Sequence, residues 1–200
     1  MKKKTLLKRI LFFLGLCFVI FVIGQSRETK LEHSEGYTLA DRTITHAYLT
    51  ANPYSRPQIP LRQVKGIVVH YTANPGSTPQ NNRDYFEGLK DNHKTHASAH
   101  FIIGADGSIM QLIPLSEIAY ASNQRNKDTI AIECCHLDRT GKFTDATYQS
   151  LVKLVSSLCH TYHLNKDDVI RHYDVTGKLC PLYYVRHQEA WLAFKRDIVV

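Results

Sequence analysis

From residue 66 onward, short apolar runs alternate with segments of helical periodicity, and this order restricts the possible folds more than any other feature of the chain. Apolar runs of about 4–8 residues are typical of buried strands, whereas apolar residues three and four apart are typical of helices that pack on a sheet. The runs predict strands over residues 67–71, 100–103, 108–113, 129–135 and 169–171. The periodic segments predict helices over residues 80–91, 144–162 and 181–194. We therefore expect an α/β fold with a central mixed β-sheet flanked by helices.

The predicted strands and helices form a single domain over residues 66–200, which is long enough to bury a hydrophobic core. Residues 26–65 are polar and contain Pro53, Pro57 and Pro60. This composition favours a linker and an irregular lead-in that packs on the domain.

The first 25 residues combine a basic beginning with the unbroken apolar run at residues 10–23, a pattern typical of export through a membrane. As a helix, this run would be about 21 Å long, which is too short to cross the ~30 Å hydrocarbon layer of a membrane. This length is compatible with the apolar part of a signal peptide. If Lys8 and Arg9 reach back to the membrane surface, the segment is long enough for a single anchor. We therefore expect a hydrophobic export or anchor helix over residues 1–25, either cleaved or retained. The remaining chain is then extracytoplasmic, membrane-anchored or secreted.

The formal net charge of +7 is concentrated at the N-terminus. Residues 1–25 contain five basic and no acidic side chains, so the rest of the chain has 20 basic and 18 acidic residues and a net charge of +2. A nearly neutral domain gives no electrostatic reason to expect binding to DNA or RNA.

Two separate motifs supply three potential ligands for a zinc ion. His70 lies at the end of the first predicted strand, and His172 and Cys180 lie eight residues apart across a segment that contains Gly177. This spacing is too long for one helical face but allows the chain to turn back around a metal. Two imidazoles and one thiolate are good zinc ligands, and three protein ligands leave one position for water, as in catalytic zinc sites. The motifs therefore predict one hydrolytic zinc ion bound by His70, His172 and Cys180.

Glu133 occupies a similar position near the end of another predicted strand. Alternate residues of a strand share a face, so Val68 and His70 point one way, as do Ala131 and Glu133 on their own strand. Ligands of open α/β sheets bind beyond the strand ends. We therefore expect His70 and Glu133 to face one cleft.

The cysteines leave two alternatives open. Export would expose Cys134, Cys135, Cys159 and Cys180 to an oxidising compartment. If Cys180 binds zinc, an odd number remains, which argues against a complete disulfide framework. Cys134 and Cys159 are then either bridged to each other or buried as free thiols.

Four ordered blocks carry a family resemblance: VVHYT at residues 68–72, SAHFII at 98–103, IAIE at 130–133, and residues 172–181, which end in KLCP. In these blocks, roughly residues 65–185, the chain resembles the zinc-dependent N-acetylmuramoyl-L-alanine amidase family. This amidase type 2 family includes phage lysozyme-type amidases and peptidoglycan recognition proteins. The resemblance implies zinc-dependent hydrolysis of the amide between N-acetylmuramic acid and L-alanine at the cell wall, with peptidoglycan or muropeptides as substrate.

The resemblance also implies roles for individual residues. His70, His172 and Cys180 correspond to the zinc ligands, Glu133 and Lys178 to catalytic residues, and His100 to a wall or substrate contact. Some members have a catalytic tyrosine immediately before the histidine of the second block, where this chain has Ala99. That role does not transfer, but other members use a glutamate at the position of Glu133.

Two alternatives to an amidase remain open at this stage. Some relatives of the same fold bind peptidoglycan without cutting it, typically where the cysteine ligand is missing. A structural zinc domain would instead need a fourth protein ligand, for which His100 is the candidate.

Overall fold

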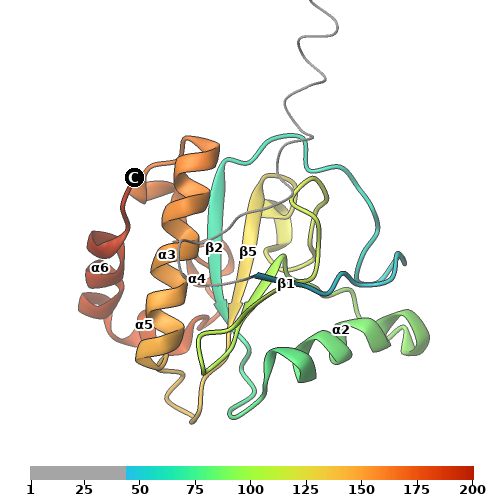
Figure 1. Ribbon diagram of the computed structural model, residues 1–200, viewed down its shortest axis with the longest axis horizontal. Coiled ribbons are helices and arrows are strands. Elements are labelled where there is room, and N and C mark those ends of the chain that lie inside the picture. Colours follow the sequence, from blue (N-terminus) through green and yellow to red (C-terminus); the bar gives the residue numbers. More distant parts are fainter. Residues whose placement is uncertain (1–43) are drawn as a thin grey trace, which may run out of the picture. The chain divides into compact units, whose positions relative to one another are not determined.

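The computed structural model describes residues 44–200 of the chain (Figure 1). The export or anchor helix predicted over residues 1–25 and the first part of the predicted lead-in lie outside the described residues. Within residues 44–200, no helix is long and apolar enough to cross a membrane.

A six-stranded mixed sheet forms the centre of the described region, in the order β1-β4-β3-β5-β2-β6. The strands are β1 (Ile44–His46), β2 (Gly66–Tyr71), β3 (Phe101–Ile103), β4 (Ile109–Gln111), β5 (Thr129–Cys134) and β6 (Val169–Arg171). Within this sheet β3 and β4 are antiparallel, and the other neighbouring strands are parallel. The mixed sheet predicted from the sequence is confirmed.

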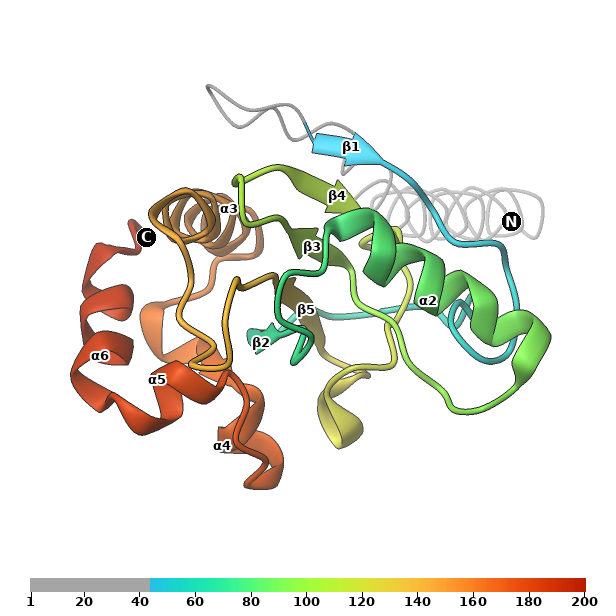
Figure 2. The same ribbon diagram turned by 90° about the horizontal axis from the view of Figure 1, so that it is seen from below.

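Helices cover both faces of the sheet, as predicted. They are α2 (Pro79–Asn92), α3 (Asp145–Tyr162), α4 (His172–Thr176), α5 (Leu182–Arg186) and α6 (Gln188–Asp197), with the 3-10 helices η1 (Asn123–Arg125) and η2 (Lys166–Asp168). Figure 2 shows α2 on one side of the sheet and α3 and α6 on the other. Thr144 caps the N-terminus of α3, because its hydroxyl accepts a hydrogen bond from the backbone N–H of Thr147.

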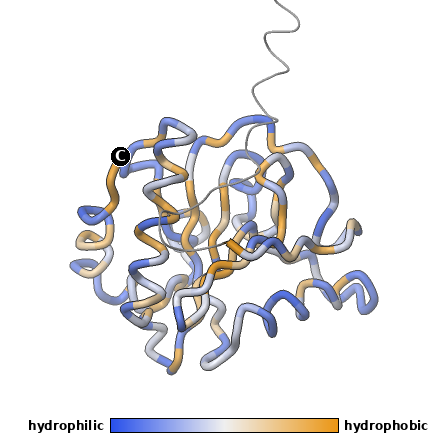
Figure 3. Tube along the Cα trace, in the orientation of Figure 1, coloured by the Kyte–Doolittle hydropathy of each residue, from blue (hydrophilic) through white to orange (hydrophobic). Residues whose placement is uncertain are grey.

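The central strands β2 and β5 are buried between these layers, which explains their almost continuously apolar sequences. Ile67, Val68 and Val69 of β2 have no exposed surface. In Figure 3 the hydrophobic residues follow the strands of the sheet. On the α2 side, Phe86 and Leu89 of the helix belong to the same buried cluster as Ile102. Polar groups can therefore reach solvent only where these strands end.

The segment predicted as an irregular lead-in contributes a strand to the sheet. Ile44–His46 pair in parallel with Ile109–Gln111 of β4, and Leu49 and Leu61 are buried further along the chain. A three-residue strand is too short to show a hydrophobic period. The pairing with β4, which is distant in the sequence, therefore determines this strand.

The single terminal helix predicted over residues 181–194 is divided into α5 and α6. Arg171 lies against this break, and its Nη1 donates hydrogen bonds to the Tyr184 carbonyl (3.0 Å) and to Gln188 Oε1 (2.8 Å). Its guanidinium thus binds a carbonyl group and a side chain on both sides of His187, where the two helices meet. The break therefore coincides with a tertiary contact, which a helical period in the sequence does not reveal.

The cysteines of the described region are free. Cys134, Cys135, Cys159 and Cys180 are all buried thiols, and no disulfide joins Cys134 to Cys159. The sequence left open whether Cys134 and Cys159 form a disulfide or are buried as free thiols, and in the structure they are buried free thiols.

Candidate metal and catalytic site

His70 and Glu133 lie side by side near the ends of β2 and β5. The two strands are parallel, and their register places His70 opposite Glu133. His70 Nδ1 lies 4.0 Å from Glu133 Oε1, with side chains 2% and 17% exposed. Residues opposite each other on neighbouring strands point to the same face, so the sheet itself holds the pair together.

The second motif reaches the same place from β6. His172 directly follows this strand and is the first residue of α4. Gly177 ends the helix with a φ of 78°, which glycine adopts without steric cost. The chain then turns back, and the backbone N–H of Tyr173 donates a hydrogen bond to the Cys180 carbonyl (2.9 Å). This return brings Cys180 close to His172.

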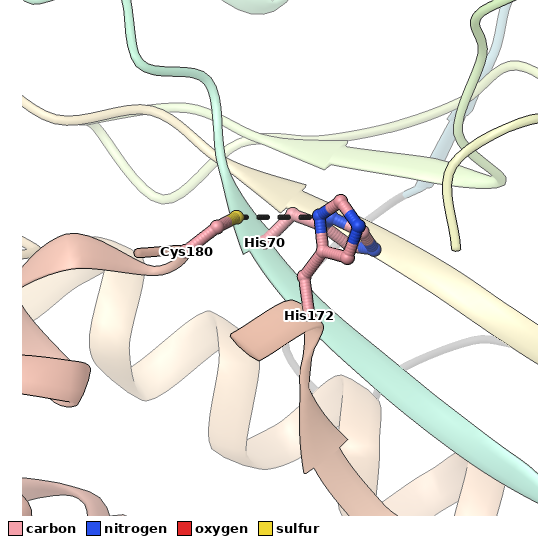
Figure 4. A group of neighbouring side chains, drawn as sticks. All are labelled: His70, His172 and Cys180. Carbon is pink, nitrogen blue, oxygen red and sulfur yellow. Dashed lines mark hydrogen bonds between the residues drawn. The ribbon is translucent and has the colours of Figure 1, made fainter. Parts of the chain in front are cut away.

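Figure 4 shows His70, His172 and Cys180 converging from these elements. One potential ligand atom of each residue lies within 4.8 Å of the other two. Cys180 Sγ is 3.8 Å from His70 Nδ1, and the two imidazole centroids are 4.6 Å apart. Zinc bonds of about 2.1 Å to nitrogen and about 2.3 Å to sulfur at a tetrahedral angle would separate the two ligand atoms by about 3.6 Å. The Cys180–His70 pair already has nearly this separation, and the three ligand atoms lie close enough together to be candidates for one zinc ion.

The protonation states of these groups also suit a metal cation. Burial lowers the pKa of His70 well below its usual value, and the charges of His172 and Lys178 act in the same direction. Burial and Lys178 likewise lower the pKa of His172. Both imidazoles are thus neutral near pH 7, as metal ligands must be. Burial raises the pKa of the Cys180 thiol to about 12, so its thiolate needs the stabilisation that a bound cation gives.

Glu133 combines a buried carboxyl group with an oxygen atom that has no partner among the described residues. Burial raises the pKa of its carboxyl group to about 8, although the charge of Lys178 opposes the shift. Its Oε2 atom is buried and has no hydrogen-bond partner among the described residues. Buried polar atoms are nearly always hydrogen-bonded, so the free oxygen marks a place for water or a substrate group.

His70, Glu133, His172, Lys178 and Cys180 line one cleft with a volume of about 290 Å³. Further polar and aromatic side chains complete its walls, among them Asn82, Tyr85, Phe86, His96, Ser98 and Tyr120. The cleft therefore combines the candidate metal ligands with hydrogen-bonding groups and aromatic surface.

His100 lies outside this cleft. The side chain is completely buried; its Nδ1 accepts a hydrogen bond from the Ala131 backbone N–H (3.0 Å), and its Nε2 donates to the Glu117 carbonyl (2.9 Å). With both ring nitrogens bonded to backbone, His100 is placed neither to contact a substrate nor to serve as a fourth ligand. Its position differs from the wall or substrate contact that we expected, because backbone groups of Ala131 and Glu117 occupy both ring nitrogens.

Two residues beside the candidate ligands were not found by sequence reasoning. Ser122 Oγ lies 3.1 Å from His70 Nε2, and Asn123 Oδ1 lies 3.2 Å from His172 Nε2. Serine and asparagine are common in loops, and nothing in the spacing of the Ser122-Asn123 pair distinguishes it from other polar connections.

The fold just described is also found in solved endolysin structures. A mutant endolysin from Bacillus subtilis matches with a TM-score of 0.65 at 27% sequence identity, and the match covers 78% of this chain and 99% of that chain. The chain therefore has the same α/β fold as this endolysin.

Residues 60–182 match the N-acetylmuramoyl-L-alanine amidase family, and the chain belongs to this family. Two relatives from Bacillus licheniformis, a probable N-acetylmuramoyl-L-alanine amidase and the N-acetylmuramoyl-L-alanine amidase CwlL, are each 34% identical to it. The matches cover 78% of this chain but 47% and 46% of the relatives. The chain thus spans about half the length of the curated relatives it matches. The predicted family membership is confirmed.

Proposed function

We propose that the chain is a zinc-dependent N-acetylmuramoyl-L-alanine amidase that hydrolyses the amide between N-acetylmuramic acid and L-alanine in peptidoglycan. The observation that carries this proposal is the convergence of His70, His172 and Cys180 within 4.8 Å, in a cleft that Glu133 also lines. Family membership supplies the substrate class.

In this proposal His70, His172 and Cys180 hold one zinc ion. When bound, zinc would polarise a carbonyl group and lower the pKa of water from 15.7 toward about 7. The structural-zinc alternative is disfavoured, because His100, its candidate fourth ligand, bonds both ring nitrogens to backbone groups.

Glu133 and Lys178 are the proposed catalytic residues. Glu133 takes a proton from the attacking water and passes it to the departing amine, a role that its pKa of about 8 and its unpartnered Oε2 support. Lys178 lies at the rim of the same cleft. Its positive charge would stabilise the negative oxygen that forms when the amide carbonyl is attacked.

We further propose that residues 66–200 form the catalytic domain and that it acts outside the cytoplasm, on the wall polymer or on muropeptides. The residues 1–25 would serve as the export signal or as the membrane anchor, which their basic and apolar composition supports.

The direct test measures the zinc content of the purified 200-residue chain and the release of new L-alanine amino termini from peptidoglycan, before and after chelation. One zinc per chain and release that stops on chelation and returns with zinc are expected. Zinc binding with peptidoglycan binding but without release would favour the non-catalytic alternative. A chain without zinc that still releases amino termini would contradict the metal site.

A further inference from the structure

We propose that Ser122 and Asn123 are positioning residues for the metal site. Each forms a hydrogen bond with Nε2 of one histidine ligand and thereby orients the ring so that its other nitrogen, Nδ1, faces the metal. This inference depends on the zinc site of the proposed function but not on the reaction. Neither residue belongs to the motifs that indicated the site.

Both imidazoles take the same tautomer in the zinc site of the proposed function. The Asn123 Oδ1 atom can only accept, so His172 Nε2 donates to it, and Nδ1 keeps its lone pair. His70 Nδ1 lies 3.8 Å from Cys180 Sγ, on the side of the candidate ligands; if Nδ1 keeps its lone pair for the metal, Nε2 carries the hydrogen and donates to Ser122 Oγ, 3.1 Å away. In Figure 4 the dashed line marks the contact between Cys180 and His70, and the His172 ring lies beside it.

The segment that carries these two acceptors is itself fixed. Ser122 is completely buried, and Asn126 Oδ1 accepts hydrogen bonds from the backbone N–H groups of Ala121 and Ser122. Asn123 has a φ of 53°, a left-handed conformation that asparagine tolerates better than most residues. The Gln124 side chain donates to the Val175 carbonyl in α4 (3.2 Å). The acceptors are therefore held in place by contacts that need no metal.

Partners of this kind have a known effect on metal sites. The second nitrogen of a histidine ligand usually donates to an acceptor that fixes the ring, and loss of the acceptor typically weakens metal binding about 10–100-fold. Here one short segment orients two ligands, one from β2 and one from α4. Removing the side-chain acceptor at Ser122 or at Asn123 should therefore weaken zinc binding although all three ligands remain.

The test compares zinc dissociation constants, measured on the full chain by competition with a chromophoric chelator. Ser122→Ala removes one acceptor, and Asn123→Gly removes the other while suiting the left-handed backbone. Each is expected to weaken zinc binding about 10–100-fold, whereas Asn123→Asp keeps an acceptor oxygen and should restore near-normal affinity. The matched control is Ser150→Ala, because this buried serine donates to the Gly107 carbonyl in another part of the fold.

A spectroscopic measurement separates positioning from general destabilisation. With cobalt in place of zinc, Ser122→Ala and Asn123→Gly should change the visible bands of the tetrahedral ion, whereas Ser150→Ala should leave them unchanged. If Ser122→Ala does not fold, the glycine and aspartate variants of Asn123 decide the question.

The possible failures are distinguishable. Wild-type zinc affinity in both Ser122→Ala and Asn123→Gly would overturn the positioning role and leave the amidase proposal intact. An unmodified chain that binds no zinc would overturn both. If the variants bind zinc more weakly but the unmodified chain does not cleave peptidoglycan, the positioning role would be supported and the amidase proposal would be overturned.

Discussion

His70 and Glu133 are opposite residues of two parallel strands, and the ladder between β2 and β5 brings His70 Nδ1 to 4.0 Å from Glu133 Oε1. A candidate metal ligand and a candidate proton carrier are thus positioned by backbone pairing and not by a loop. The pairing of the two strands should persist when either side chain is replaced, so metal binding by His70 and proton transfer by Glu133 can be tested separately by substitution.

Glu133→Gln is expected to keep one zinc per chain and to lose about 10²–10⁴-fold in turnover. Glutamine has a similar shape but cannot accept the proton of the attacking water. The measurement is the rate of release of L-alanine amino termini, together with metal content. Glu189→Gln, at an exposed position in α6, is the control and should keep full activity. Full turnover in Glu133→Gln would remove the carboxylate from the mechanism.

Cys180→Ser is expected to weaken zinc binding by more than about tenfold and to abolish release, since a hydroxyl is a poorer ligand than a thiolate. Chelator competition gives the affinity. Cys159→Ser is the matched control, because Cys159 is also a buried free thiol but lies in α3, outside the metal group. If the two serine variants bind zinc equally well, Cys180 is not a ligand.

Burial of His100 should make stability depend on pH. Burial lowers the pKa of this imidazole from 6.5 to about 4, so between these values the unfolded chain binds a proton that the folded chain does not. The free energy of unfolding should therefore fall by about 3 kcal/mol as the pH drops from 6.5 to 4, and should not change through this group above pH 6.5.

The measurement is urea unfolding of the metal-free chain and of His100→Asn across this pH range. The variant should be less stable at pH 7, because asparagine is too short to replace both backbone hydrogen bonds, but its stability should depend less on pH. Parallel curves for the two proteins would show that His100 does not titrate in this way.

Arg171→Met should destabilise the C-terminal helices. The guanidinium bonds Asp174, the Tyr184 carbonyl and Gln188, and lies 5.4 Å from the centre of the Trp191 ring. Asp174 is partly exposed, so we expect a loss of about 2–3 kcal/mol in the free energy of unfolding, below the full cost of breaking a buried ion pair.

Urea denaturation measures this loss. The exposed Arg186 offers a matched control, and Arg186→Met should change stability by less than about 0.5 kcal/mol. Equal stabilities of the two methionine variants would contradict the role of Arg171 in holding the helices.

The central strands and the three candidate ligands could be predicted from the sequence for a physical reason. Strands buried on both faces must be almost entirely apolar, so a histidine or glutamate near the end of such a run is conspicuous. His172 and Cys180 were found by their chemistry and by a spacing that includes a glycine. None of these features depends on distant contacts.

The features that could not be predicted all depend on tertiary partners. β1 is a strand because β4 offers an edge, and the break between α5 and α6 coincides with the contacts of Arg171 to groups of both helices. Ser122 and Asn123 matter only because the folded chain brings two histidines beside them. The position of His100 likewise follows from the contacts of its ring with the backbone of Ala131 and Glu117.

His70 and Cys180 are 110 residues apart in the chain, and β6, the last strand in sequence, completes the sheet beside β2. A chain synthesised from its N-terminus therefore has His70 and Glu133 in place well before His172 and Cys180 exist. Because metal binding requires the assembled ligands, it should favour the docking of this final strand. We expect a nascent chain to bind no zinc at this site until Cys180 has been synthesised, and chains that end before residue 169 to stay without the metal.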